Sequence, residues 1–99
     1  MRLSRRKMTH VRFEPNVDRG TTYAFEYKAG KLVIGRERMH RLILEIPSGG
    51  RDLEELVDRL VDPRARGGAA YPDKGELLAD VMRLVEADVL EVTRDPGRP

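Results

Sequence analysis

Few side chains in this chain can attack a substrate or exchange a proton with it. His10 and His40 have no second histidine three or four residues away, so neither begins a helical metal site. Ser4 and Ser48 lie outside any G-x-S-x-G motif, and the absence of cysteine excludes thiol catalysis and thiolate metal sites. Acidic pairs such as Glu54–Glu55 are typical of a solvated helix face. We therefore expect a non-catalytic protein with no metal site and no cofactor.

Apolar residues in two segments are better suited to binding a partner. A strand over residues 31–34 and a helix within residues 73–92 would enclose an apolar groove if the strand is outermost in its sheet and lies beside the helix. An exposed strand edge can bind an extended peptide through main-chain hydrogen bonds. The alternative is that these residues simply form the core, which we favour for Leu77, Val81 and Leu84. The candidate peptide-binding residues are Lys31, Leu32, Val33, Ile34, Leu78, Val81, Met82 and Val85.

The predicted helix within residues 73–92 follows from capping and periodicity. Asp73 can cap its first turn, and Glu76 stands three residues later at the capping-box position. Its apolar residues cover an arc of about 140° if the chain turns about 100° per residue. That arc is wider than contact with one partner requires. We expect this segment to end in a short strand or an extended exit.

The strands are expected before the helices. Val11 and Phe13 alternate with polar residues, which favours a short strand before Pro15. From Thr21 onward the alternation is clear, and we expect an aromatic inner face formed by Thr21, Tyr23, Phe25 and Tyr27. A turn with Gly30 in the left-handed conformation should then lead into the strand over residues 31–34, which we expect to end at Gly35.

Two further helices are indicated between this hairpin and residue 73. Met39, Leu42, Ile43 and Ile46 have helical spacing, and Pro47 should stop that helix. Asp52 is placed to cap a second helix, with Leu53, Leu56, Val57 and Leu60 as its apolar face. Residues 62–72 hold no periodicity and are interpreted as a mobile loop. Strands followed by helices predict an α+β fold in which a three-stranded antiparallel sheet precedes three helices.

Charge is distributed unevenly along the 99 residues. The first twelve residues contain five basic and no acidic side chains, so the net charge of +2 comes from this segment. We interpret residues 1–10 as a disordered basic tail, residues 11–92 as a single domain and residues 93–99 as a second disordered tail. No apolar run is long enough for a membrane span or a signal sequence, so we expect a cytoplasmic protein.

Several segments resemble the PqqD-like family, the leader-peptide recognition elements of ribosomal peptide modification pathways. They are LEELVDRL at 53–60, Tyr71-Pro72 and LLADVMRLVEADVLEV at 77–92, with the hairpin YAFEYKAGKLVI at 23–34 and the segment MHRLILEIPSGG at 39–50. The resemblance spans residues 11–92, and it rests on the order of the elements. Gly35 departs from it, because the family often has Asn there. Mycofactocin-type chaperones and lasso-peptide recognition proteins are both compatible with it.

The resemblance implies a winged-helix-like domain that binds the leader of a precursor peptide as an added strand. The strand at 31–34 would pair with the leader, and Leu78, Val81, Met82 and Val85 would receive its side chains. The domain would then deliver the peptide to a modifying enzyme, such as a radical SAM enzyme, a cyclodehydratase or a leader peptidase.

The main alternative is a winged helix-turn-helix regulator that binds DNA, because the helix order is the same. A recognition helix should bring Arg, Lys, Asn or Gln to the groove. Residues 73–92 instead carry six acidic side chains against Lys74 and Arg83, and only the basic arm with Arg64 and Arg66 argues for DNA. A permanent homodimer that buries the groove is a third interpretation. We expect neither nucleic acid nor a membrane as a partner.

Overall fold

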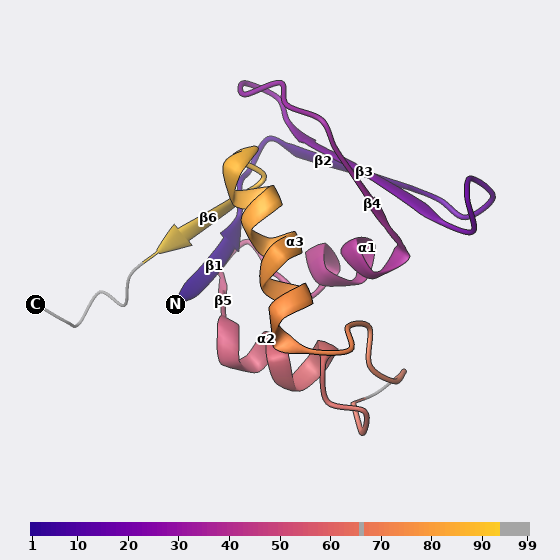
Figure 1. The fold of residues 1–99 in the computed structure, drawn as a ribbon. Coiled ribbons are helices and arrows are strands. Elements are labelled where there is room, and N and C mark those ends of the chain that lie inside the picture. Colours follow the sequence, from indigo (N-terminus) through magenta and orange to yellow (C-terminus); the bar gives the residue numbers. More distant parts are fainter. Residues whose placement is uncertain (66, 94–99) are drawn as a thin grey trace, which may run out of the picture.

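The structure, a computed structural model, describes residues 1–65 and 67–93. Within these residues the chain forms two antiparallel three-stranded sheets and three helices (Figure 1). The predicted α+β class and the three helices are confirmed, but the expectation of one three-stranded sheet is wrong because a second sheet is present. The elements are β1 (Arg2–Arg5), β2 (Thr9–Glu14), β3 (Thr21–Glu26), β4 (Val33–Arg36), α1 (Glu37–Leu44), β5 (Arg51–Asp52), α2 (Leu53–Leu60), α3 (Lys74–Glu86) and β6 (Leu90–Thr93).

The larger sheet has the strand order β2-β3-β4, and β4 lies at its edge. Gly30 has a φ of 67° in the connection between β3 and β4, which confirms the predicted left-handed glycine. β4 begins two residues later than expected and continues through Gly35 to Arg36. Gly35 leaves room for the fully buried Met39, because an added Cβ would lie 2.5 Å from the sulfur of that side chain, which would then have to shift.

The two faces of this sheet are the reverse of those expected. Thr22, Ala24 and Glu26 are buried, whereas Tyr23 and Phe25 are only partly covered. The prediction of an aromatic inner face is therefore wrong. Small residues are needed on the inner face because α1 packs against that side, and Thr22 also donates its hydroxyl hydrogen to the carbonyl of Arg36 at 2.7 Å.

The second sheet has the order β5-β1-β6 and joins the first strand of the chain to the last described one. The predicted disordered tail at residues 1–10 is wrong, because β1 is the central strand of this sheet and β2 begins at Thr9. Leu3 is fully buried and anchors β1 in the core. The domain thus includes residues before the predicted boundary at 11. Of the tail predicted at 93–99, Thr93 belongs to β6 and the remainder lies outside the described residues.

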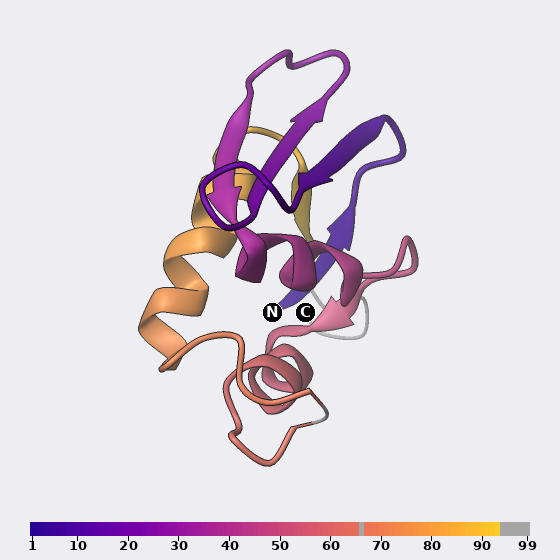
Figure 2. The same cartoon turned by 90° about the vertical axis from the view of Figure 1, so that its right-hand side faces the viewer.

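The core lies between the two sheets and the helices. Figures 1 and 2 show the sheet β2-β3-β4 at one end of the molecule and α2 at the other, with α1 between them and α3 along one side. α1 buries Met39, Leu42 and Ile43, as the helical spacing predicts. The largest other buried apolar side chains are Leu3, Ile46, Leu56, Leu60, Tyr71, Leu77, Val81, Leu84 and Leu90.

The two predicted helix caps have different outcomes. The carboxylate of Asp73 accepts a hydrogen bond from the N–H of Glu76 at 2.9 Å, so the predicted cap of α3 is confirmed. Asp52 occupies the N-cap position of α2, but its side chain makes no capping hydrogen bond. Within residues 1–65 and 67–93, no helix has both the length and the apolar character to cross a membrane.

Candidate peptide-binding groove

The outer edge of β4 is bordered by two hollows, which are together called the groove below. β4 pairs with β3 on one side, and within the described part of the chain no strand pairs with its other side. Two hollows of about 540 and 290 Å³ lie along this edge, and Arg83 of α3 lines both of them. The predicted arrangement, an edge strand with α3 beside it, is therefore present.

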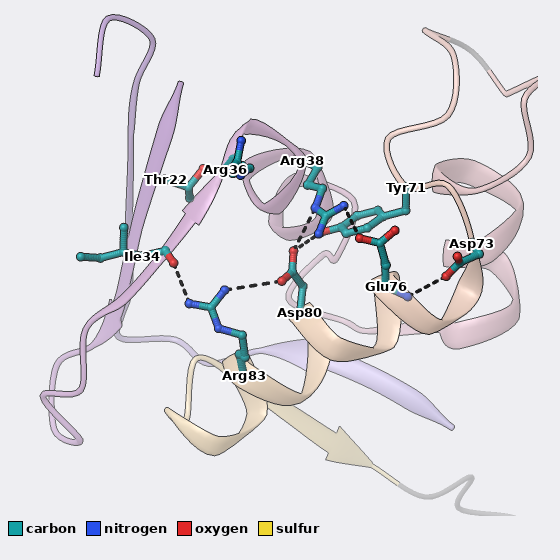
Figure 3. A network of polar contacts seen from close by, with 9 residues as sticks. All are labelled: Thr22, Ile34, Arg36, Arg38, Tyr71, Asp73, Glu76, Asp80 and Arg83. Carbon is teal, nitrogen blue, oxygen red and sulfur yellow. Dashed lines mark hydrogen bonds and ion pairs between the residues drawn. The ribbon is translucent and has the colours of Figure 1, made fainter. Parts of the chain in front are cut away.

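The backbone of β4 is oriented toward α3. The guanidinium of Arg83 donates a hydrogen bond to the carbonyl oxygen of Ile34 at 2.6 Å (Figure 3). In an antiparallel ladder the N–H and C=O of one residue point to the same side of the strand. The N–H of Ile34 therefore also faces the groove, and an incoming strand can pair with both groups.

A buried carboxylate organises the helix side of the groove. Asp80 is 7% exposed, and its carboxylate accepts a hydrogen bond of 2.8 Å from the hydroxyl of Tyr71. Its oxygens also lie 3.7 Å from Nε of Arg38 and 3.5 Å from Nη1 of Arg83, as Figure 3 shows. A buried charge is stable only when it is paired and hydrogen-bonded. Asp80 thus holds both arginines in place at the rim of the groove.

Tyr71 and Arg38 complete this network. Tyr71 is almost fully buried, and the N–H groups of Ala70 and Tyr71 both bond to the carbonyl of Leu60, so this end of the predicted mobile loop is anchored. Arg38 lies 4.7 Å above the centre of the Tyr71 ring and pairs with Glu76 at 3.2 Å. Burial, reinforced by the bond to Asp80, raises the pKa of Tyr71 well above its ordinary value. Tyr71 therefore remains a neutral donor.

The predicted strand residues lie at the groove, with one exception. Lys31 and Leu32 line the smaller hollow and Ile34 lines the larger one, and all three side chains are exposed. Val33 also borders the smaller hollow, but its side chain is buried in the core. A peptide in the groove would thus meet the side chains of Lys31, Leu32 and Ile34 directly.

The predicted helix residues do not face the groove. Val81 is fully buried in the core, and Leu78 and Val85 are half-buried against it. At about 100° per residue, Leu78, Met82 and Val85 lie about 100° to 160° around α3 from Arg83, which points at β4. The groove therefore has a polar wall in place of the expected apolar floor. It is lined by Asp80, Arg83 and Glu86 of α3 and by Ala87, the C-cap of this helix.

Sequence reasoning missed the residues that build this wall, although one signal was present. Asp80 stands between Leu77, Val81 and Leu84 on the buried face of α3, where a carboxylate is costly unless it has partners. That position alone indicates a buried polar network. The sequence carries no comparable sign that Arg38 and Tyr71 are the partners, because both come from other segments.

Comparison of the chain with protein-family models, with curated proteins and with solved structures finds no match.

Proposed function

We propose that this chain is a non-catalytic peptide-binding protein that captures the leader of a ribosomally made precursor peptide as a strand added to β4. It then delivers the peptide to a modifying enzyme of the radical SAM, cyclodehydratase or leader-peptidase kind. The observation that carries the proposal is the orientation of Ile34, whose carbonyl is directed into the groove beside α3. The resemblance to the PqqD-like family supports the same reading, with β2, β3 and β4 followed by three helices as a winged-helix-like unit.

The proposed mechanism begins with Arg83. Its bond to the carbonyl of Ile34 satisfies an acceptor that the edge strand would otherwise leave unpaired. An incoming strand replaces this bond with a main-chain N–H and also accepts from the N–H of Ile34. Arg83 is then free to bind a carbonyl or carboxylate of the peptide, while Asp80 keeps it at the rim.

In this proposal, the exposed residues next to the groove determine which peptide side chains are preferred. Main-chain pairing is independent of sequence, so it supplies affinity, and pockets for alternate side chains supply specificity. Leu32 and Ile34 offer apolar contacts, and Lys31 and Glu86 offer charges at the same end of the groove. The peptide best suited to this edge has apolar side chains at alternate positions and a charged residue beyond them.

Two substitutions at one position test the proposal. Ile34→Pro removes the outward N–H and leaves the pairing of β4 with β3 intact, since proline is tolerated at a strand edge whose N–H faces outward. Ile34→Ala keeps the N–H and removes only side-chain contacts, so it is the matched control. A labelled leader from the precursor encoded beside this chain would be titrated by fluorescence anisotropy. We expect Ile34→Pro to weaken binding by about 5- to 150-fold, from an unsatisfied main-chain partner costing about 1–3 kcal/mol.

The same titration can overturn the proposal. Equal affinities of Ile34→Pro and the parent protein would exclude strand addition at β4. Absence of leader binding by the parent protein would exclude the leader as ligand. Leader peptides methylated on alternate main-chain nitrogens give an independent test. Methylation of the N–H groups that face β4 should abolish binding, and methylation of the N–H groups that face away should not.

A further inference from the structure

The sheet β2-β3-β4 has a second free edge, formed by β2 on the side opposite β4. β2 pairs with β3 along its whole length, and none of the described strands pairs with its other side. Figure 2 shows β2 and β4 at opposite edges of this sheet. An edge strand exposes main-chain groups that can pair with another chain. The groove at β4 leaves this second edge unused.

Two residues of β2 direct their main-chain N–H and C=O groups outward. The N–H of Tyr27 bonds to the carbonyl of Met8 at 3.0 Å, and the register of the ladder places these two residues opposite each other. Bonded and non-bonded pairs alternate along an antiparallel ladder, so the main-chain groups of Val11 and Phe13 point away from β3. The same alternation, carried across β3 to β4, makes Ile34 face outward, and its bond to α3 agrees with this.

A hollow of about 480 Å³ lies beside this edge, between β2, α1 and the connection from β1 to β2. Its apolar lining comes from Val11 of β2 and from Ile43 and Leu44 of α1, and Leu44 is 63% exposed. Phe13 stacks on the ring of His40 with ring centres 4.8 Å apart, which ties β2 to α1. A strand added to β2 would therefore direct every second side chain toward α1 and this hollow.

The charged side chains that line this hollow are cationic. They are Arg5 at the end of β1 and Arg6 and Lys7 in the turn after it, and no carboxylate of the described residues lines the hollow with them. In the part of the chain that the structure describes, none of the three lies within 4.0 Å of a carboxylate oxygen. An adjoining hollow shares these cations but also contains Glu26 and Glu91. The excess of positive charge is therefore greatest beside β2 and α1.

We propose that the β2 edge binds an extended acidic segment of another protein as an added strand. The main-chain groups of Val11 and Phe13 would pair with the segment, as in other cases of strand addition. The cations precede β2, so the C-terminal end of an antiparallel segment would lie beside them. The segment that fits this edge has apolar side chains first, which contact Leu44, and acidic side chains after them, at alternate positions.

Other occupants fit this edge less well. Among the described strands of this chain, none carries more than one acidic residue, so a second copy offers no acidic strand. Nucleic acid is bound through phosphate contacts and stacking on exposed rings. The hollow is lined mainly by aliphatic and cationic side chains, and the ring of His40 is already stacked on Phe13. The unpaired main-chain groups of β2 favour a peptide as the ligand.

The test is an NMR titration of the isotope-labelled full chain with an acetylated peptide of about eight residues, a length typical of a strand. Two valines and then two glutamates occupy alternate positions in this peptide, with threonine between them. We expect saturable shifts of the amide signals of Val11, Phe13 and Leu44, and slower hydrogen exchange at Val11. A peptide with glutamine in place of glutamate should bind about fivefold more weakly, and added salt should reduce this difference.

The same spectra can overturn the proposal. No shift of these amides at about 1 mM peptide would exclude strand addition at β2, and shifts confined to Ile34 and Arg83 would place the peptide at β4 instead. Protection of the Val11 N–H in the free protein would show that a second copy already covers the edge. An oligouridylate that shifts the same amides at a lower concentration than the peptide would assign the cations to nucleic acid.

Variants separate main-chain pairing from charge. Val11→Pro removes the outward N–H and should weaken peptide binding by about 5- to 150-fold, whereas Val11→Ala keeps the N–H and is the matched control. Replacing the exposed Arg6 and Lys7 together by glutamine should remove the preference for glutamate over glutamine, and Lys31→Gln at the opposite edge should preserve it.

The charge variants keep the proposal testable even if Val11→Pro does not fold. An undiminished preference for glutamate after replacement of Arg6 and Lys7 would refute the role of the cations. Ile34→Pro should leave the affinity for the acidic peptide unchanged, because β2 and β4 lie on opposite sides of β3. This site and the proposed leader site can therefore fail independently.

Discussion

The bond between Tyr71 and Asp80 makes a quantitative prediction about the groove network. Tyr71→Phe removes one hydroxyl group and leaves the ring packed against Arg38. A hydrogen bond to a charged acceptor contributes about 1.5–3 kcal/mol to stability. Asp80 keeps its contacts with Arg38 and Arg83 in this variant, so we expect a loss of about 2 kcal/mol. In a domain of this size that loss lowers the melting temperature by about 8–16 °C.

The measurement is urea unfolding at neutral pH, where Tyr71 is protonated in the folded and the unfolded state. A double-mutant cycle with Asp80→Asn isolates the interaction between the two side chains. The stability losses of the two single variants, added together, should exceed the loss of the double variant by about 1 kcal/mol or more. Tyr27→Phe is the control, because that side chain is exposed and its change should stay within about 0.5 kcal/mol. A change of the same small size for Tyr71→Phe would show that the bond does not hold the network together.

Two further predictions concern other parts of the fold. Leu3→Ala should reduce the free energy of unfolding by about 2–5 kcal/mol in urea titrations, because Leu3 is fully buried. The control Met8→Ala should change it little, because Met8 is exposed. Equal effects of the two substitutions would argue against β1 as a core strand. The hydrogen bond from the N–H of Ala29 lowers the pKa of Glu26 in the folded protein. The ionised Glu26 carboxylate therefore stabilises the fold above the pKa that this group has in the unfolded chain, and this stabilisation is lost as the pH falls through the folded-state pKa. The parent protein should therefore lose more stability than the Glu26→Gln variant between about pH 5 and 3. Parallel curves of unfolding free energy against pH for the two proteins would disprove this role of Glu26.

The helices were predictable because their signals are local. Helical spacing located the buried face of α1, and Asp73 marked the start of α3, where its side chain does form the cap. The β3–β4 hairpin was equally local, with Gly30 in the left-handed conformation. Each of these signals lies within one element or one turn.

The second sheet and the direction of the aromatic face were not predictable in the same way. β1 has one buried apolar residue, Leu3, and its partners lie at Arg51 and Val92, so nothing near it in sequence indicates a strand. In β3 the alternation shows which residues share a face but not which face is covered. The packing of α1 decides that, and it favours Thr22 and Ala24 over the larger rings.

In the candidate site, too, the elements were predictable from local signals, whereas the residues that line the groove were not. β4 was expected at the sheet edge beside α3 because the hairpin and the helix are both locally encoded. The composition of the groove depends on the rotation of α3 about its axis, which is fixed by the burial of Leu77, Val81 and Leu84. That rotation turns Arg83 toward β4 and Met82 away from it. Contacts between distant segments therefore set the chemistry of the groove.

The central position of β1 also sets the order of events during synthesis. Leu3 leaves the ribosome long before its partner Val92 is added to the chain. At about 5–20 residues per second, β1 waits for several seconds without that neighbour. The nascent chain must keep Leu3 from pairing elsewhere during this interval, and the basic side chains at Arg2 and Arg5 disfavour association with other copies. Closure of the domain is thus a late step that follows the synthesis of β6.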